Sequence, residues 1–345
     1  MVFKLSRILL CCIALSSCVS SEPELEFIDD ARAQDVLAIM PYEFDDQGRI
    51  TVAVFVNGQG PLDFIIDSAA TRTLVYESTR QALELEFIED ETTFVHGAVL
   101  AEDRQVFPIA NLSVGSIEQT NIRSFSLPDP QTPSPHPAGI LGLDFLSQYS
   151  MYVNVDDQRL IFAKSGYTPD RQRFVSIPIE FDDLGLVEFG LPIIEVRVQG
   201  RPVDALLDLG ASETIANWAA ANKFGVNVRN YLRGQIEFDG VFGTIPIQSA
   251  ANGAQIKIGK RIWSNQHVSI ANLPVFKTLK RSETPAMLVS AALLREENYI
   301  IDFPASKLFL EADREQRKGT GITELCTLLP SGLVICRDIS TNIPQ

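Results

Sequence analysis

Apolar and polar residues alternate in short runs along most of the chain, a pattern typical of β-strands with one buried face. Residues 50–56 are rich in β-branched side chains, and residues 193–198 alternate cleanly between apolar and polar positions. Glycine follows closely after both runs. Helical periodicity is confined to short stretches at 79–85, 217–224 and 286–296. The pattern therefore predicts an all-β protein with a few short helices.

The chain also repeats itself. Three segments recur in the same order in both halves: 43–46 and 180–183, the runs that end at Asp67 and Asp208, and 154–162 and 302–310. The offset between the copies drifts along the chain, which is what loop insertions produce. Self-similarity of this kind indicates a tandem duplication.

The duplication divides the chain into two lobes. Lobe one covers residues 41–163 and lobe two covers residues 177–312. A polar segment with proline and glycine, 164–176, links them. Residues 313–345 form a tail that follows the second lobe. Because both halves belong to one chain, we expect a monomer.

Two cysteines in the tail flank a Pro-Ser-Gly turn between two apolar runs. A hairpin centred on that turn would place Cys326 opposite Cys336, and in an oxidising compartment this predicts a disulfide. A metal pair is the alternative, which two ligands alone support poorly.

The N-terminus has the features of an export signal. Basic residues precede an apolar run, 8–15, that is too short to span a bilayer. A leucine and two serines then precede Cys18, which resembles the lipobox of bacterial lipoproteins. The resemblance implies a signal peptide at 1–17, a lipid on Cys18, a tether at 18–40 and a periplasm-facing position, with the outer membrane favoured because no aspartate follows the cysteine. A plain secretory peptide cut near Ser20 is the alternative.

Charge and motifs narrow the function classes. The formal net charge is −15, which excludes a nucleic-acid partner because phosphate binding needs a basic face. The three histidines are scattered without ligand spacing, so no metal site is predicted. No Gly-x-Ser-x-Gly motif or phosphate-binding glycine loop occurs.

Each half contains an apolar run that ends in an aspartate and is followed by small residues: Asp67 before Ser68, Ala69 and Ala70, and Asp208 before Leu209, Gly210 and Ala211. A carboxylate at the end of a buried strand is costly unless it is used or satisfied. Two of them at equivalent places can meet between the lobes, share one proton and activate a water molecule without a cofactor.

This motif resembles the active-site signature of aspartic proteases, in particular retropepsin-like proteases of bacterial envelopes. The resemblance covers most of residues 41–312 and implies duplicated β-barrel lobes with the cleft between them. It assigns Asp67 and Asp208 as the catalytic pair, with Ser68, Ala69, Gly210 and Ala211 supporting them. It also implies hairpin flaps over the substrate, for which 94–99 and 238–244 are the candidates. The flap residues expected to contact substrate are His96, Gly97, Gly240 and Phe242.

The motif departs from the family pattern at three places. Ala69 stands where glycine is expected, Leu209 replaces a hydroxyl residue, and Ser290 replaces the glycine of a later apolar-apolar-glycine motif that lobe one retains at Gly142. In the family the two hydroxyls interlock across the lobes, so half of that lock is missing.

Two functions follow as hypotheses. The first is an aspartic endopeptidase that cuts an exported protein or peptide at the cell envelope. The second is a lipoprotein that keeps the protease fold and binds a peptide or protein partner without cleaving it.

Overall fold

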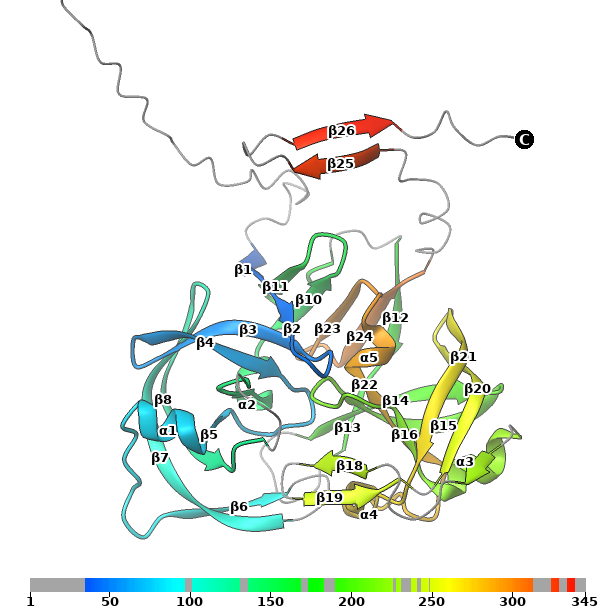
Figure 1. The fold of residues 1–345 in the computed structure, drawn as a ribbon, viewed down its shortest axis with the longest axis horizontal. Coiled ribbons are helices and arrows are strands. Elements are labelled where there is room, and N and C mark those ends of the chain that lie inside the picture. The colour runs from blue at the N-terminus through cyan, green and yellow to red at the C-terminus, as the bar shows by residue number, and fades with distance from the viewer. Residues whose placement is uncertain are drawn as a thin grey trace, which may run out of the picture.

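The computed structural model describes residues 35–96, 101–130, 136–168, 173–182, 190–225, 228–230, 237–240, 243–247, 249–312, 324–328 and 334–338. Strands dominate this part of the chain, with five short helices in it. The prediction of an all-β protein built from two duplicated lobes is confirmed (Figure 1).

Lobe one is an eight-stranded sheet that curls until β3 also pairs with β7. In spatial order its strands are β2 (Glu43–Phe44), β3 (Ile50–Val56), β4 (Gln59–Ile66), β9 (Gly139–Leu141), β5 (Leu74–Tyr76), β8 (Ile117–Leu127), β7 (Ala101–Val114) and β6 (Thr92–His96).

Lobe two repeats this order, with β14 pairing β20 to curl the sheet. Its strands are β13 (Glu180–Asp182), β14 (Leu191–Val198), β15 (Arg201–Asp208), β22 (Ala286–Ser290), β16 (Ile215–Ala216), β21 (Arg261–Ile270), β20 (Ser249–Ile258) and β17 (Val228–Asn230). A separate hairpin is formed by β18 (Glu237–Gly240) and β19 (Gly243–Pro246).

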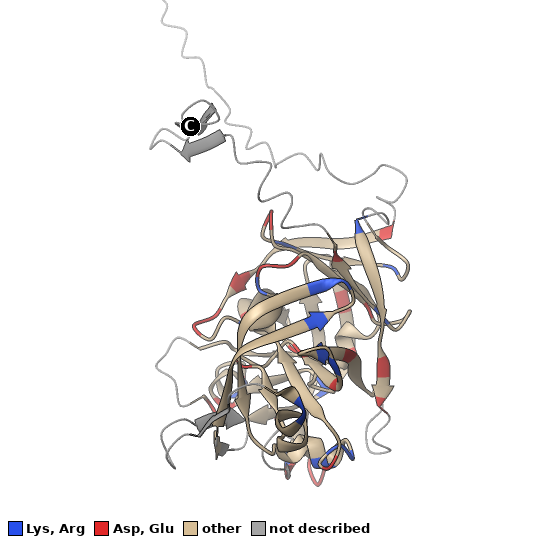
Figure 2. Ribbon diagram, turned by 90° about the vertical axis from the view of Figure 1, so that its right-hand side faces the viewer, with Lys and Arg blue, Asp and Glu red and all other residues tan. Residues whose placement is uncertain are grey.

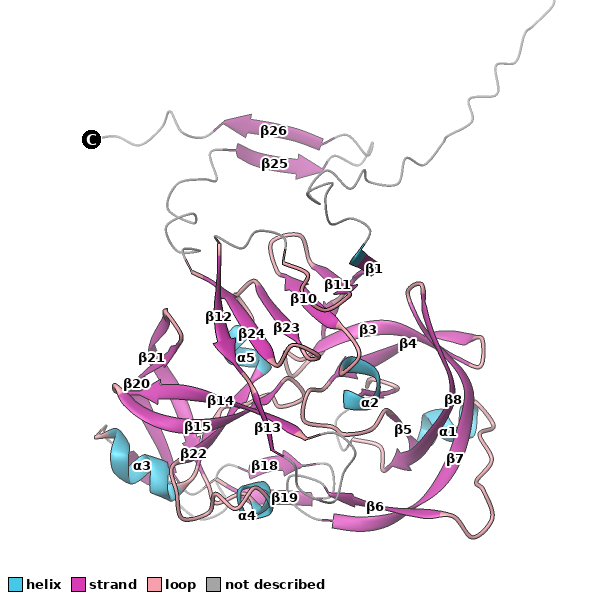
Figure 3. Cartoon of the chain, turned by 180° about the vertical axis from the view of Figure 1, so that it is seen from behind, coloured by secondary structure: helices cyan, strands magenta, loops and turns pink. Residues whose placement is uncertain are grey.

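A six-stranded sheet joins the lobes at the top of Figure 1, and Figure 3 shows it from behind. Its order is β1 (Val36–Pro41), β11 (Arg159–Ala163), β10 (Ser150–Asn154), β23 (Tyr299–Asp302), β24 (Lys307–Glu311) and β12 (Phe174–Pro178). Each half of the chain supplies three strands, and the seam is the antiparallel β10–β23 pair. The boundaries expected at residues 41 and 176 therefore fall within strands β1 and β12.

The strands form because alternate side chains enter the core. In β4, Phe64 and Ile66 lie in the main core, whereas Ile65 between them faces a smaller cluster on the other side of the sheet. All three side chains are fully buried, and each burial contributes about 1.5–3 kcal/mol. The main core runs through both lobes, so the two halves share one apolar interior.

One of the three expected helices is confirmed and two differ. Helix α3 (Trp218–Phe224) begins after Asn217, whose side chain accepts from the N–H of Ala220. Helix α1 (Glu77–Ala82) begins two residues before the expected 79–85. The expected helix at 286–296 is wrong in its first half, because residues 286–290 are strand β22 and only α5 (Ala291–Leu294) is helical.

The reason for that error is tertiary. An apolar run is compatible with a helix or with a fully buried strand, and β22 is buried at all five positions between β15 and β16. The remaining helices are α2 (Leu143–Leu146), at the place equivalent to α5, and α4 (Pro274–Thr278).

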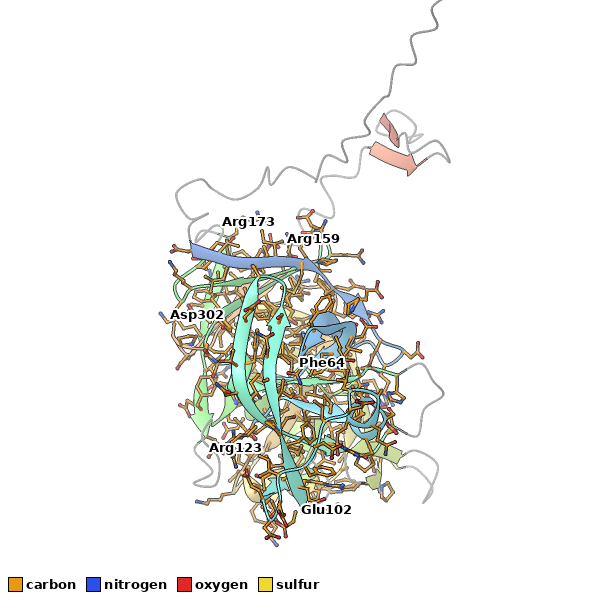
Figure 4. The ribbon with its side chains drawn as sticks, turned by 90° about the vertical axis from the view of Figure 1, so that its left-hand side faces the viewer. Phe64, Glu102, Arg123, Arg159, Arg173 and Asp302 are labelled. Atoms are coloured by element: carbon orange, nitrogen blue, oxygen red, sulfur yellow. The ribbon has the colours of Figure 1, made fainter. Side chains whose placement is uncertain are left out.

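Charged residues are spread over many strands and loops of both lobes (Figure 2). Figure 4 places Glu102 of β7 at one end of the molecule, Arg159 and Arg173 at the six-stranded end, and Phe64 between them. Within the described residues, no helix combines the length and the hydrophobicity that a bilayer crossing requires.

The predicted C-terminal hairpin is formed by β25 (Glu324–Leu328) and β26 (Val334–Asp338), and its register places Cys326 opposite Cys336. The side chains of both cysteines lie outside the described part of the chain, so the disulfide stays a prediction. Cys18 and its signal segment also lie outside the described residues.

Candidate active site

Both candidate aspartates lie where a central strand ends beside a parallel neighbour. Asp67 follows β4, and its backbone N–H donates to the carbonyl of Leu141 in β9 at 3.1 Å. Asp208 ends β15 and is level with Ser290 in β22. The duplicated sequence therefore builds the same strand arrangement twice and brings each aspartate to the same place in its lobe.

Each carboxylate is held by its own loop in the same way. Oδ1 of Asp67 accepts from the N–H groups of Ala69 at 2.7 Å and Ala70 at 2.9 Å. Oδ1 of Asp208 accepts from those of Gly210 and Ala211, both at 3.0 Å. The support expected from these small residues is thus given by their backbone N–H groups.

Gly210 brings the two aspartates together. Its N–H holds Asp208, and a Cβ atom added at Gly210 would overlap the carboxylate of Asp67 from the other lobe. Position 210 therefore requires glycine because a carboxylate lies directly against its backbone.

Burial and mutual repulsion act on the pair. Asp208 is only 9% exposed, and burial followed by the charge of Asp67 raises its pKa well above the ordinary value of 3.8. Burial also raises the pKa of Asp67, opposed by its hydrogen bonds from Ala69 and Ala70. Both directions favour a pair that retains a proton at a pH where exposed aspartates have lost theirs.

A cation lies near the pair. The positive charge of Arg49 acts against the rise in pKa of both Asp67 and Asp208. Arg49 is anchored in the turn before β3 by an ion pair with Asp45, with Nη2 and Oδ2 2.6 Å apart. The ion pair holds this charge in place.

Ser68 connects the lobes beneath the aspartates. Its hydroxyl donates to the carbonyl of Leu207 at 2.7 Å and accepts from the N–H of Leu209 at 3.1 Å, both in lobe two. Leu209, at the equivalent position, is fully buried in the main core and has no hydroxyl to return the bonds. One half of the reciprocal lock is therefore present and the other is replaced by apolar packing.

The loops behind the dyad are secured differently in the two lobes. In lobe one, the carboxylate of Asp144 accepts from the N–H of Thr73 at 2.8 Å and from its hydroxyl at 2.7 Å. Gly142 donates to that hydroxyl, and a Cβ there would lie 2.5 Å from the carbonyl carbon of Arg72.

In lobe two, Ser290 stands at the place of Gly142, and its hydroxyl is 3.1 Å from that of Thr214. A hydroxyl pair thus takes over the connection that a carboxylate makes in lobe one.

Comparison with known proteins agrees with this geometry. The model of the aspartyl protease family matches residues 52–145 and, a second time, residues 194–290. The chain belongs to the aspartyl protease family. Each match contains one aspartate with its loop and ends at or just after the strand beside it. A search of curated proteins found no match.

Each lobe of this aspartyl protease family member has a β-hairpin at the place where a flap was expected. β6 pairs with β7, with His96 opposite Ala101, and β18 pairs with β19, with Gly240 opposite Gly243. The hairpins lie at the end of the molecule opposite the six-stranded sheet (Figure 1). Gly97 and Phe242 lie outside the described residues, as does the side chain of His96.

The sequence analysis missed several groups around this aspartyl protease site. Arg49 contributes charge near the dyad, and Thr73 and Asp144 hold the loop behind it. Two of them left a signal in the sequence: Thr73 repeats as Thr214, six residues after each aspartate, and Asp144 stands two residues after Gly142. Tyr76 was also missed. It is buried, and its pKa is raised by burial and, among nearby charges, by that of Asp67.

Proposed function

We propose that this protein is an aspartic endopeptidase. The observation that carries the proposal is a pair of carboxylates, one from each lobe, that are held by equivalent backbone hydrogen bonds and both lie against Gly210. Asp208 is buried and Asp67 is half-buried. Two carboxylates so close together retain one proton between them, which is the arrangement that acid–base hydrolysis of an amide requires.

Burial raises the pKa of both aspartates, and the charge of Asp67 raises that of Asp208 further, so the pair holds one proton. The unprotonated carboxylate removes a proton from water as the water oxygen attacks the peptide carbonyl carbon, and the protonated carboxyl group gives its proton to the carbonyl oxygen. The newly protonated carboxyl group then gives its proton to the leaving nitrogen as the C–N bond breaks, and the other carboxylate takes up the proton that the diol hydroxyl releases, which restores the pair.

Cleavage of a randomised peptide library by the full chain in mild detergent, from pH 3 to 8, tests the proposal. We expect cleavage that is reduced at least about 10³-fold in Asp67→Asn and in Asp208→Asn. Asp63→Asn, which changes an exposed acid on β4, is the control and should retain cleavage. Cleavage that persists in both dyad variants would contradict the assignment.

A binding function is the second candidate, and Leu209 is the observation that favours it. With Leu209 in place of a hydroxyl residue, lobe two returns no side-chain hydrogen bond to lobe one at this position. A folded protein that leaves the library intact at every pH, yet retains peptides on a column, would select this alternative.

We further propose that Cys18 carries lipid and holds the protein at the periplasmic face of the outer membrane, where exported proteins are the substrates. The leucine and two serines before Cys18 support this proposal. Labelling of cells with an alkyne fatty acid should mark the protein, and Cys18→Ser should abolish the label. A labelled Cys18→Ser protein would refute lipidation at this residue.

A further inference from the structure

A small apolar cluster lies beside Asp67, on the face of the lobe-one sheet that points away from the main core. It consists of Ile65, Leu74, Tyr76, Phe125, Leu127 and Ile140. Ala70, from the loop that holds Asp67, and Val95, from the β6–β7 hairpin, pack against it. Since the cluster connects the dyad loop to the hairpin, it forms the lobe-one wall of the site.

The equivalent wall of lobe two differs at one position that faces Glu213. The parallel registers of β5 with β8 and of β16 with β21 place Phe125 and Ser269 at equivalent positions in the two lobes. Ser269 is buried, and its hydroxyl donates to Oε2 of Glu213 at 3.0 Å. A carboxylate held by a serine thus stands in lobe two where lobe one has an aromatic ring.

A cavity of about 200 Å³ opens beside Glu213. Its other lining residues include Gln266, His267, Ser290 and Ala292. Ala292 is equivalent to Asp144 of lobe one, since each stands two residues after the last residue of the Gly142 or Ser290 motif. The lobe-one carboxylate that reaches Thr73 has no counterpart here, and this leaves the space open.

One residue that lines the cavity is a neighbour of Asp208. Ser290 lines it and is level with Asp208 in the paired strands β15 and β22. Glu213 follows Asp208 by five residues, and the residue five after Asp67 is Arg72. The two sides of the site therefore carry opposite charges at equivalent positions.

We propose that this cavity is the subsite for an arginine or lysine side chain of a bound peptide. Glu213 is half-buried, and its Oε1 makes no hydrogen bond among the described residues, so it is available to accept from a cationic group. Leu293 and Ile256 line the same cavity and contact the aliphatic part of such a side chain. The inference rests on the proposed function, since it takes the dyad as the place where peptide lies.

Peptide retention tests the subsite independently of catalysis. Full-chain Asp67→Asn protein is immobilised and incubated with a randomised peptide pool that contains one arginine, mixed with the same pool carrying citrulline, its neutral isostere. Mass spectrometry measures the ratio of the retained pools. We expect arginine peptides to be enriched about tenfold or more, and Glu213→Gln to bring the ratio close to one.

Glu195→Gln is the matched control, because it removes an exposed carboxylate on β14 and reports enrichment caused by the protein's overall negative charge. It should retain the preference for arginine. Equal retention of the two pools, retention of neither, or an unchanged ratio in Glu213→Gln would overturn the subsite.

The same pools given to the protein without substitutions separate this inference from the proposed function. Arginine preference in retention without any cleavage would overturn the endopeptidase and support the subsite. Cleavage that treats arginine and citrulline peptides alike would support the endopeptidase and overturn the subsite.

Discussion

At the scale of single residues, the geometry of the dyad depends on the absence of a side chain at Gly210. Gly210→Ala would place a Cβ against the carboxylate of Asp67, so either that carboxylate or the Gly210 loop must move. We expect cleavage to fall by about 10²-fold or more, since a shift of about 1 Å at the reacting groups has that effect. Initial rates on a cleaved library peptide measure it. Ala69→Gly removes a Cβ at the equivalent position of lobe one, and this variant should retain a measurable rate of cleavage. Equal rates in both variants would contradict the argument.

The raised pKa of Asp208 predicts a pH-dependent stability. The folded protein holds the proton of Asp208 to higher pH than the unfolded chain does, so the free energy of unfolding falls as the pH rises above about 4 toward the folded pKa. Asp208→Asn removes the titrating group and with it this fall in the free energy of unfolding. Relative to the protein without substitutions, the variant should therefore gain stability between pH 4 and pH 7, by about 1.4 kcal/mol for each unit by which the pKa is raised.

Urea denaturation at a series of pH values checks this, with Asp63→Asn as the control for loss of one carboxyl group. Parallel pH profiles for Asp208→Asn and the protein without substitutions would show that burial of the dyad does not perturb its titration.

The two aspartates could be predicted from the sequence because the duplication repeats them with their loops. Arg49 could not, because it is distant from both motifs in the sequence, and Glu213 follows the second motif directly but gives no sign in the sequence of the cavity beside it. Leu209 was identified as a departure from the family pattern, but only the structure shows that Ser68 makes both bonds of the remaining half of the lock.

At the scale of elements, Ser68 is the tie between two strand ends. Ser68→Ala leaves the buried N–H of Leu209 and carbonyl of Leu207 without this partner, which should lower the free energy of unfolding by about 2–4 kcal/mol. Chemical denaturation measures the change. Ser68→Thr retains the hydroxyl and should lose less. If Ser68→Thr lowered the free energy of unfolding as much as Ser68→Ala, packing around residue 68, and not its hydrogen bonds, would determine the stability of this site.

The connection between the Asp67 loop and α2 gives a second element-scale prediction. Asp144→Ala removes the acceptor for both bonds from Thr73 and should cost about 1–3 kcal/mol. Asp144→Asn keeps an oxygen at the same place, and since burial already raises the pKa of Asp144, loss of its charge should be tolerated. Thermal denaturation distinguishes the two, and equal losses would contradict an acceptor role for Asp144.

Strand periodicity predicted most elements, but it failed where an element is buried on every side. β22 lacks alternation because it lies between two strands of a closed sheet, so its sequence resembles that of a buried helix. The helix at 217–224 was predictable because Asn217 caps it and Gly225 ends it in a left-handed conformation.

At the scale of the whole molecule, a buried polar network joins the two halves. Asn298 of lobe two accepts from the N–H of Val155 and donates to Asp156, both in lobe one, and also donates to Glu311. Asn298→Ala should lower the free energy of unfolding by about 1–3 kcal/mol, because the half-buried N–H of Val155 and the buried carboxylate of Glu311 each lose a hydrogen bond.

Calorimetry measures this variant. Asp157→Asn is the control, because it changes an exposed side chain next to Asp156 in the turn between β10 and β11. Its free energy of unfolding should lie within about 1 kcal/mol of that of the unsubstituted protein. If Asn298→Ala matched the control, the network would not couple the halves.

The β10–β23 seam has a consequence for the assembly of the chain from pieces. Each half contributes three strands to one sheet and neither half covers the seam without the other, and in the part of the chain that the structure describes no strand lies between β11 of the first half and β12 of the second. Two polypeptides divided there should associate when produced in one cell, as the subunits of a heterodimer do. Each would be inert alone and complete only as a pair, which makes the protein a candidate reporter for bringing two fused partners together.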